Sequence, residues 1–199
     1  MAKNPELILA SSSRYRRELL DRLGLPYTAE ASDIDETSPE GETPVAACKR
    51  LAVEKAKFIA ARHPGAVVIG SDQVADLGGK RLGKPHTRDR AIAQLLEMQG
   101  RTTVFYTALA VIDAKGTVRS ALSATRVKMR PLSRETIEAY VDREEPFDCA
   151  GSAKIEKLGV ALMERVDSDD PTSLVGLPLI TLTTLLSQSG IEVLPGLCR

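Results

Sequence analysis

The segment "LILASSSRYRRELLDRLG", residues 7–24, decides how the fold begins. The apolar run over residues 6–10 predicts a short buried strand, and residues 14–23, closed by Gly24, predict a helix. A strand that leads through a short loop into a helix is the basic unit of an α/β fold. Three serines, residues 11–13, fill the loop, so hydroxyl groups and a helix N-terminus come together at one place.

The first turn of this helix carries Arg16 and Arg17. A helix N-terminus has a partial positive charge, so arginines there are disfavoured by about 0.3–1 kcal/mol unless an anion offsets them. Ser11, the free N–H groups of the helix and the Arg16 guanidinium together match a phosphate. A solvated helix with Ser13 as an ordinary N-cap explains the same residues, and the spacing alone does not separate the two interpretations.

The rest of the chain alternates predicted strands and helices. We expect a strand near residues 27–32, a buried strand that begins at residue 65 and ends near Asp72, an antiparallel hairpin over residues 102–130 around "DAKG", a strand over residues 160–166, and helices over residues 44–62, 87–98, 133–143 and 170–190, the last broken near Pro178. This pattern predicts an α/β fold with a mixed β-sheet and flanking helices, in a single domain over residues 1–199.

The charge balance and the cysteines narrow the class of protein. Lys and Arg together number 27, as do Asp and Glu, so the formal net charge is zero. Broad binding to nucleic acid or to an anionic membrane needs a basic excess or a basic face, so we expect neither partner. The 3 cysteines are far apart, no signal-peptide core opens the chain, and no apolar run reaches membrane-spanning length. We therefore expect a reduced cytoplasmic protein.

The helix that begins at Pro44 carries a lysine on its apolar face. Lys55 shares a stripe at helical spacing with Val45, Cys48, Ala52 and Ile59. One interpretation has the lysine extending its ammonium group to the solvated rim of the helix. The other has that rim facing a ligand, so that the ammonium group becomes a second phosphate contact.

Asp72 follows the apolar run "VVIGS" at the expected end of a buried strand. A carboxylate held rigidly there suits a general base that activates water, or a metal ligand, whereas a turn-capping aspartate is the ordinary alternative. Lys84, in "LGKP", comes just past the following turn and can return to the same place. Asp35 and Glu36 add two carboxylates in an acidic loop, a kind of loop that is more often only solvated.

Several common catalytic motifs are absent from the sequence. It contains no GxSxG elbow, no GxxxxGK[ST] loop, no GxGxxG and no HExxH, and its histidines, His63 and His86, lie in polar surroundings. A histidine-dependent triad or a zinc hydrolase is therefore disfavoured. Carboxylates acting with a divalent ion are the best remaining catalytic candidates.

Six motifs, in order, carry a resemblance to a known family: "LASSSRYRRELL", "RLAVEKA", "IGSDQV", "LGKP", "AGSAKIEKLG" and "LVGLPL". In this order and spacing they resemble the Maf family of nucleotide pyrophosphatases across nearly the whole chain. The resemblance implies an elongated, two-lobed fold with a central cleft, similar to inosine triphosphate pyrophosphatase, and often a homodimer. It also implies hydrolysis of a nucleoside triphosphate between its α- and β-phosphates with Mg²⁺ or Mn²⁺.

The resemblance also implies a role for each matching residue. Asp72 falls on the family's proton acceptor and, with Glu36, on its acidic positions near the metal and the attacking water. The phosphate-contacting positions of the family are occupied here by Ser11, Arg16, Lys55 and Lys84.

Three positions depart from the branch of the family that acts on dTTP and UTP. Tyr15 stands where that branch has its first arginine, Gln73 where it has threonine, and Glu156 where it has glutamine. This combination resembles instead the branch assigned to 7-methyl-GTP, although that branch can carry tryptophan at the Tyr15 position. Without the resemblance, helix packing for Tyr15 and a surface ion pair of Glu156 with Lys154 or Lys157 would be the simpler interpretations.

The three substitutions agree with the chemistry of a methylated guanine. Methylation at N7 makes the ring cationic, and an aromatic side chain such as Tyr15 can stack on it with a cation–π contribution. The Glu156 carboxylate can accept hydrogen bonds from guanine N1–H and the 2-amino group, and its charge favours the cationic base.

Three hypotheses follow for the activity. The leading one is a pyrophosphatase that removes 7-methyl-GTP. A second keeps the reaction but changes the substrate to another modified or ordinary nucleotide, such as dTTP or UTP. A third is a nucleotide-binding regulator, because Maf proteins have been linked to inhibition of septum formation. Two carboxylates near a triphosphate disfavour a pure binder, since they hinder binding unless a cation or a water uses them.

Overall fold

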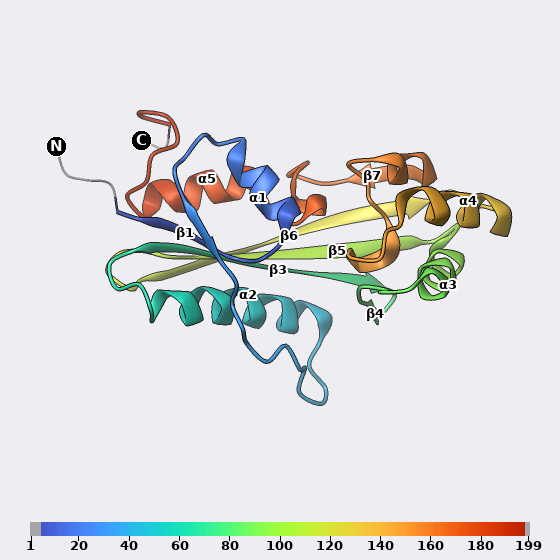
Figure 1. Ribbon diagram of the computed structural model, residues 1–199, viewed down its shortest axis with the longest axis horizontal. Coiled ribbons are helices and arrows are strands. Elements are labelled where there is room, and N and C mark those ends of the chain that lie inside the picture. Colours follow the sequence, from blue (N-terminus) through green and yellow to red (C-terminus); the bar gives the residue numbers. More distant parts are fainter. Residues whose placement is uncertain (1–4, 198–199) are drawn as a thin grey trace. The chain divides into compact units, whose positions relative to one another are not determined.

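The computed structural model describes residues 5–197. Its strands form a mixed sheet in the order β2-β1-β3-β5-β6-β7, with β4 paired to β3 (Figure 1). The strands are β1 (Leu7–Ala10), β2 (Thr28–Glu30), β3 (Val67–Leu77), β4 (Lys80–Leu82), β5 (Thr102–Ile112), β6 (Val118–Met129) and β7 (Met163–Asp167). Helices flank the sheet, which confirms the predicted mixed α/β fold.

Capping side chains explain where most of the helices begin. The α-helices are α1 (Arg14–Asp21), α2 (Pro44–Ala60), α3 (Arg88–Met98), α4 (Arg134–Glu144) and α5 (Leu179–Gln188). The first four begin after a serine or threonine whose hydroxyl accepts a backbone N–H of the first turn, at Ser13, Thr43, Thr87 and Ser133. Short 3₁₀ turns lie at residues 150–152, 158–162 and 173–175. No helix among residues 5–197 is long and apolar enough to cross a membrane.

The chain divides into two compact units. The first unit holds the chain up to Asp72, residues 107–123 and the chain from Asp170 onward. The second unit holds residues 73–106 and 124–169. Strands β3, β5 and β6 therefore contribute residues to both units.

In the first unit, helices cover both faces of β1 and the start of β3. These two strands are parallel, with Leu9 opposite Ile69, and β1 also pairs in parallel with β2. Leu19 and Leu20 of α1 pack with Leu182, on α5, in the core cluster on one face. Helix α2 lies on the other face (Figure 1).

A glycine lets α2 approach β3 closely. A Cβ atom at Gly70 would lie 2.2 Å from the carbonyl oxygen of Ala52 and 2.8 Å from the Cβ of Ala56. Only a residue without a side chain fits this contact. The small residues on both sides therefore set how near the helix comes to the strand.

The second unit is built on antiparallel pairings and two helices. Strand β3 turns back into β4, and β6 pairs with β7. Helices α3 and α4 pack together, and Arg88 of α3 donates its Nη2 to Asp142 of α4 over 2.9 Å. Each of the two units contains buried residues of its own.

Two predicted strand boundaries are wrong. Strand β3 does not end near Asp72 but continues to Leu77, because the residues beyond it are again largely buried and form a hairpin with β4. The strand expected over residues 160–166 begins only at Met163, because residues 158–162 form a 3₁₀ turn. The predicted break near Pro178 is confirmed, since a 3₁₀ turn precedes it and α5 follows it.

Candidate active site

Asp72 lies in the middle of β3 and just past the end of the neighbouring strand. Strand β1 ends at Ala10, one residue after the pair of Leu9 and Ile69. The carboxyl end of a parallel strand is where ligands bind in α/β sheets. Asp72 is only 6% exposed, so its carboxylate is held inside the protein rather than in a surface turn.

Lys55 is buried against Asp72 and does not reach the solvated rim of α2. Its side chain comes from the α2 turn that the close contact at Gly70 presses onto β3, and it is 7% exposed. Its Nζ lies 2.7 Å from Asp72 Oδ1 and 2.8 Å from Glu36 Oε1. The interpretation of Lys55 as a solvated lysine is therefore wrong, since its ammonium group is shared between two carboxylates.

Glu36 reaches the same lysine from a loop. Residues 31–43 contain no helix or strand, and the Glu36 side chain is 54% exposed. An acidic residue of this loop is thus placed beside Asp72 by their common partner, Lys55. The neighbouring Asp35 instead interacts with Thr37, whose side chain first and whose backbone N–H second lower the pKa of Asp35.

Arg16 is fixed by two hydrogen bonds from its guanidinium. Its Nη1 donates to Ser11 Oγ over 3.3 Å, and its Nε donates to the carbonyl oxygen of Gly176 over 3.0 Å. The buried Ser11 hydroxyl also accepts the N–H of Ser13 over 3.1 Å. Ser13 in turn caps α1, so the predicted N-cap is confirmed.

The electrostatics of Arg16 reflect the carboxylates near it. Burial lowers the pKa of Arg16, while Asp72, Cys48 and Glu36 act in the opposite direction. An arginine begins so far above neutral pH that the group keeps its charge. The structure therefore brings together Ser11, Arg16, Glu36, Lys55 and Asp72, which we call the acid–cation cluster.

One oxygen of the acid–cation cluster is left without a partner. Asp72 Oδ2 is buried and has no hydrogen-bond partner among the described residues. Buried polar atoms are nearly always paired, so an orphaned carboxylate oxygen points to a missing ligand, a water or an ion. Such an oxygen can accept a proton or coordinate a metal.

The donor set fits a magnesium-type ion that the substrate helps to hold. The described residues contain no group of three or more His, Cys, Asp or Glu that could hold a metal by themselves. Mg²⁺ is usually bound through one or two carboxylates, with waters and substrate phosphates completing its coordination. Asp72 and Glu36, both at Lys55, supply that number of carboxylates.

Tyr15 faces a cation within the first unit. The Arg14 guanidinium lies 4.8 Å from the centroid of the Tyr15 ring, and Arg14 Nη2 donates to the Tyr15 hydroxyl over 2.8 Å. Arg14 precedes Tyr15 in α1, so this contact is made within one helix, and the role of Tyr15 in base recognition stays a prediction.

The other three predicted residues belong to the second unit. Gln73 follows Asp72 in β3 and is half-buried, while Lys84 is exposed just after β4. Glu156 is exposed and forms no ion pair with Lys154 or Lys157 among residues 5–197.

Lys154 instead anchors the turn that carries Glu156. Its buried Nζ donates to the carbonyl oxygens of Glu144 and Glu145 at the end of α4, over 2.8 and 3.0 Å. Its own carbonyl accepts the N–H of Gly159 over 3.0 Å. These hydrogen bonds fix the backbone of the turn between residues 154 and 159, which carries Glu156.

Some residues of the site were missed by the sequence analysis. The Gly176 carbonyl accepts from Arg16 and also from Ser71 Oγ, over 3.1 Å, and Cys48 Sγ donates to the Asp72 carbonyl over 3.2 Å. Gly176 lies in the quoted motif "LVGLPL", but a backbone carbonyl leaves no signal in residue type. Cys48 was on the predicted stripe with Lys55, which was the available hint.

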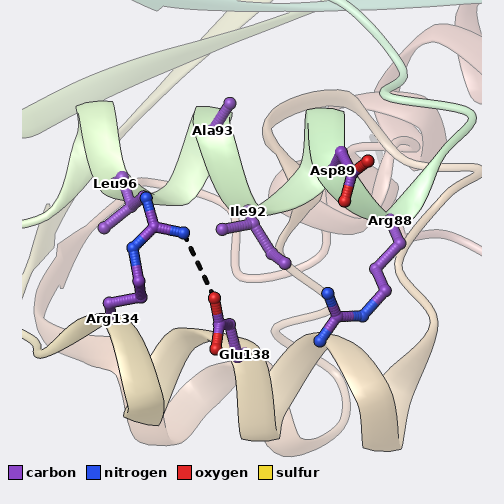
Figure 2. A pocket seen from close by; sticks show the side chains of 7 residues that line it. All are labelled: Arg88, Asp89, Ile92, Ala93, Leu96, Arg134 and Glu138. Carbon is purple, nitrogen blue, oxygen red and sulfur yellow. Dashed lines mark hydrogen bonds and ion pairs between the residues drawn. The ribbon is translucent and has the colours of Figure 1, made fainter.

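A pocket elsewhere does not involve any predicted site residue. It lies in the second unit between α3 and α4, measures about 260 Å³, and is shown in Figure 2. Its lining consists of Arg88, Asp89, Ile92, Ala93, Leu96, Arg134 and Glu138. Arg134 pairs with Glu138 and Arg88 with Asp142, so its cations are already engaged by carboxylates.

Comparison with known proteins identifies a family and similar enzymes. A family model described as "Maf-like protein" matches residues 6–189. A protein of Thiobacillus denitrificans named 7-methyl-GTP pyrophosphatase is 54% identical over 192 residues, which cover 96% of each chain. A protein of Bordetella pertussis with the same name is 53% identical over 192 residues, again 96% of each chain.

Among solved structures, a HAM1 protein from Coxiella burnetii has a similar fold. Its TM-score is 0.51 at 15% sequence identity, and the match covers 92% of this chain and 99% of that one. At this identity the likeness concerns the fold alone.

Proposed function

This chain belongs to the Maf family, and from that premise we propose that it is a nucleotide pyrophosphatase that hydrolyses 7-methyl-GTP to 7-methyl-GMP and diphosphate. The names of relatives that are about half identical over nearly their whole length support the substrate. The observation that carries the reaction is the unpartnered oxygen of Asp72, buried beside the cations of Lys55 and Arg16.

In the proposed mechanism Asp72 acts as a general base. Its Oδ2 accepts a proton from a water molecule as the water oxygen bonds to the α-phosphorus. The bond between that phosphorus and the oxygen bridging to the β-phosphate breaks, and diphosphate leaves. Arg16 and Lys55 neutralise charge on the phosphate chain, with Ser11 and Lys84 as further proposed contacts.

A divalent cation would be held by Asp72 and Glu36. When bound, Mg²⁺ or Mn²⁺ would supply positive charge to the phosphate oxygens. Lys55 contacts one oxygen of each carboxylate in the structure, so its positive charge lowers their mutual repulsion.

We propose that the base is recognised by Tyr15, Gln73 and Glu156. An aromatic ring that already faces the Arg14 guanidinium can equally face the cationic ring of 7-methylguanine. Glu156 is exposed and free of ion pairs with its lysine neighbours among residues 5–197, so its carboxylate is available to accept hydrogen bonds.

The proposal is tested by identifying products. Purified protein is incubated with 7-methyl-GTP, GTP, dTTP or UTP and with Mg²⁺ or Mn²⁺, and the products are separated by chromatography. We expect diphosphate and 7-methyl-GMP, with the highest kcat/KM for the methylated nucleotide. Release of orthophosphate would contradict the reaction, and a preference for dTTP or UTP would contradict the substrate.

A variant ties the activity to Asp72. Asp72→Asn keeps the shape but removes the proton acceptor, and it should lower kcat by about 10²–10⁴-fold. Asp76→Asn, on the same strand, is the matched control because Asp76 Oδ1 accepts the N–H of Gly79 and lies outside the acid–cation cluster. Nucleotide binding without turnover in the wild type would favour the regulator instead.

A further inference from the structure

Residues 170–180, which include most of the connection from β7 to α5 and the first two residues of α5, are linked by several hydrogen bonds within the first unit. Asp170 is 2% exposed, and its Oδ1 accepts the N–H of Thr172 over 2.9 Å. Its Oδ2 accepts the N–H of Ile180 over 2.8 Å. Ile180 is in the first turn of α5, whose N-cap is Pro178 and offers no side-chain acceptor. Asp170, eight residues before Pro178, therefore caps the N-terminus of α5 with its side chain. A carboxylate is favoured at a helix N-terminus.

The Thr172 hydroxyl ties the two ends of the same segment together. It accepts the N–H of Leu179 over 2.8 Å, and its single proton lies within reach of Asp170 Oδ1 at 2.7 Å and the Leu177 carbonyl at 2.8 Å. A second anchor comes from β5, where Thr107 Oγ1 donates to the Ser173 carbonyl over 2.8 Å. These bonds determine the path of the backbone between residues 172 and 179.

That path presents one carbonyl to the acid–cation cluster. Gly176 is buried and has a φ of +117°, a conformation that other residues rarely adopt. Its carbonyl oxygen accepts from Arg16 Nε over 3.0 Å and lies 3.1 Å from Ser71 Oγ, whose single proton is also within reach of the Ala108 carbonyl at 2.9 Å. A single backbone oxygen thus contacts both the phosphate-binding arginine and the residue before Asp72.

This contact sets the plane of the guanidinium. Nε bonds to Gly176 and Nη1 bonds to Ser11, and these two hydrogen bonds together favour one orientation of the planar group. Neither of these two bonds uses Nη2. It is the donor that a phosphate oxygen can take.

We propose that Asp170 and Thr172 are positioning residues, which hold the Gly176 carbonyl against Arg16 and so fix its guanidinium for the phosphate chain. The proposal deepens the proposed function and rests on it. Neither side chain needs to touch the substrate, because both act through the backbone at Gly176.

The first test replaces the hydroxyl of Thr172. Thr172→Val keeps the shape and should lower kcat/KM by about tenfold, mainly through kcat, because a small misplacement of a charge-stabilising group weakens it most in the transition state. Thr172→Ser restores the hydroxyl and should keep most of the activity. Thr183→Val, in α5, is the matched control, since the Thr183 hydroxyl donates to the Leu179 carbonyl of its own helix.

A double-mutant cycle separates positioning from plain stabilisation. In an Arg16→Met background, Thr172→Val should change kcat/KM by less than about twofold, because the group it positions is gone. Its effect on the unfolding temperature should remain the same in both backgrounds. Equal losses of kcat/KM with and without Arg16 would overturn the proposal, as would full activity of Thr172→Val.

A binding measurement keeps the inference distinct from the proposed function. Calorimetric titration with inorganic diphosphate and Mg²⁺ needs no turnover, and Thr172→Val should weaken this binding only when Arg16 is present. If the wild type hydrolyses no nucleoside triphosphate, the proposed function fails while this result still decides the inference. Should Thr172→Val fail to fold, Asp170→Asn takes its place in the same cycle. The asparagine NH₂ group cannot accept a hydrogen bond, so at least one of the backbone N–H groups that Asp170 now binds loses its acceptor.

Discussion

At the scale of single residues, Asp72 shows how function conflicts with packing. One of its oxygens pairs with Lys55, and the other is buried without a hydrogen-bond partner among residues 5–197. A buried polar atom left unpaired costs roughly 1–3 kcal/mol. Folding alone does not account for such an oxygen, whereas a site that takes a water or a cation does.

The Glu156 carboxylate gives a test of base recognition. Glu156→Gln should lower the ratio of kcat/KM for 7-methyl-GTP over UTP by about tenfold, because a neutral amide no longer favours the cationic ring and can match the single ring N–H of uracil. Initial rates with both nucleotides provide the measurement. Glu164→Gln, at an exposed carboxylate of β7, is the control, and an unchanged ratio for Glu156→Gln would remove this residue from the proposal.

At the scale of elements, the contact between α2 and β3 can be tested at Gly70. A methyl group there would collide with backbone atoms of α2, so Gly70→Ala should destabilise the protein by about 1–3 kcal/mol. It should also lower activity, because Lys55 and Asp72 sit on the two elements that are pushed apart. Urea unfolding measures the first effect and initial rates the second.

The control for this change is another glycine. Gly83→Ala adds a methyl group that meets nothing within 4 Å and needs no positive φ. It should leave both the free energy of unfolding and the rate near wild type. Wild-type stability in Gly70→Ala would mean that α2 can move away from β3 without cost.

The hairpin between β5 and β6 has a pH-dependent support. Asp113 Oδ1 accepts the N–H groups of Lys115 and Thr117, and Oδ2 accepts from Arg119 Nη1 over 2.8 Å. The bond to Arg119 is the main reason that the pKa of Asp113 falls from 3.8 to about 2. Its contribution to stability is therefore full above the unfolded-state pKa and is lost as pH falls toward 2.

A variant of Asp113 should show this dependence. Asp113→Asn keeps an oxygen for the turn but removes the charge, and it should cost about 1–2 kcal/mol at pH 7. The difference from wild type should shrink between pH 4 and pH 2. Thermal unfolding at several pH values measures it, and a difference that stays constant across this range would contradict the assignment.

Local signals in the sequence predicted the elements best. Hydroxyl caps such as Ser13 and Ser133 and the turn "DAKG" act on residues a few positions away, so their helices and hairpin were expected correctly. The end of β3 was predicted wrongly because its continuation depends on pairing with β4. The 3₁₀ turn over residues 158–162 has no comparable local signal.

At the scale of the whole molecule, three strands belong to both compact units. Strands β3, β5 and β6 continue from one unit into the other without a break. Unfolding of a shared strand in one unit should weaken the pairing of the same strand in the other unit. We therefore predict a single cooperative unfolding transition, with calorimetric and van't Hoff enthalpies that agree. Two separate transitions would contradict the prediction of a single domain. The homodimer that the family resemblance implies stays a prediction for sedimentation analysis.

The candidate site was predicted in part, and distance along the chain explains the limit. Ser11, Arg16, Lys55 and Asp72 could be proposed because each has a chemically suggestive side chain at the edge of a predicted element. The pairing of Lys55 with Glu36 and the contact of Arg16 with a carbonyl 160 residues away depend on the assembled fold. Such contacts leave no periodic pattern to read.

The two halves of the acid–cation cluster differ in how easily evolution can alter them. Lys55 stands on a helix pressed onto β3 at Gly70, so moving its ammonium group means rebuilding a helix–strand contact. Glu36 comes from a loop with no regular structure. We therefore expect that changes in the loop around Glu36 can alter the metal or nucleotide preference during evolution. The position of Lys55 should change less, because it depends on the packing of α2 on β3.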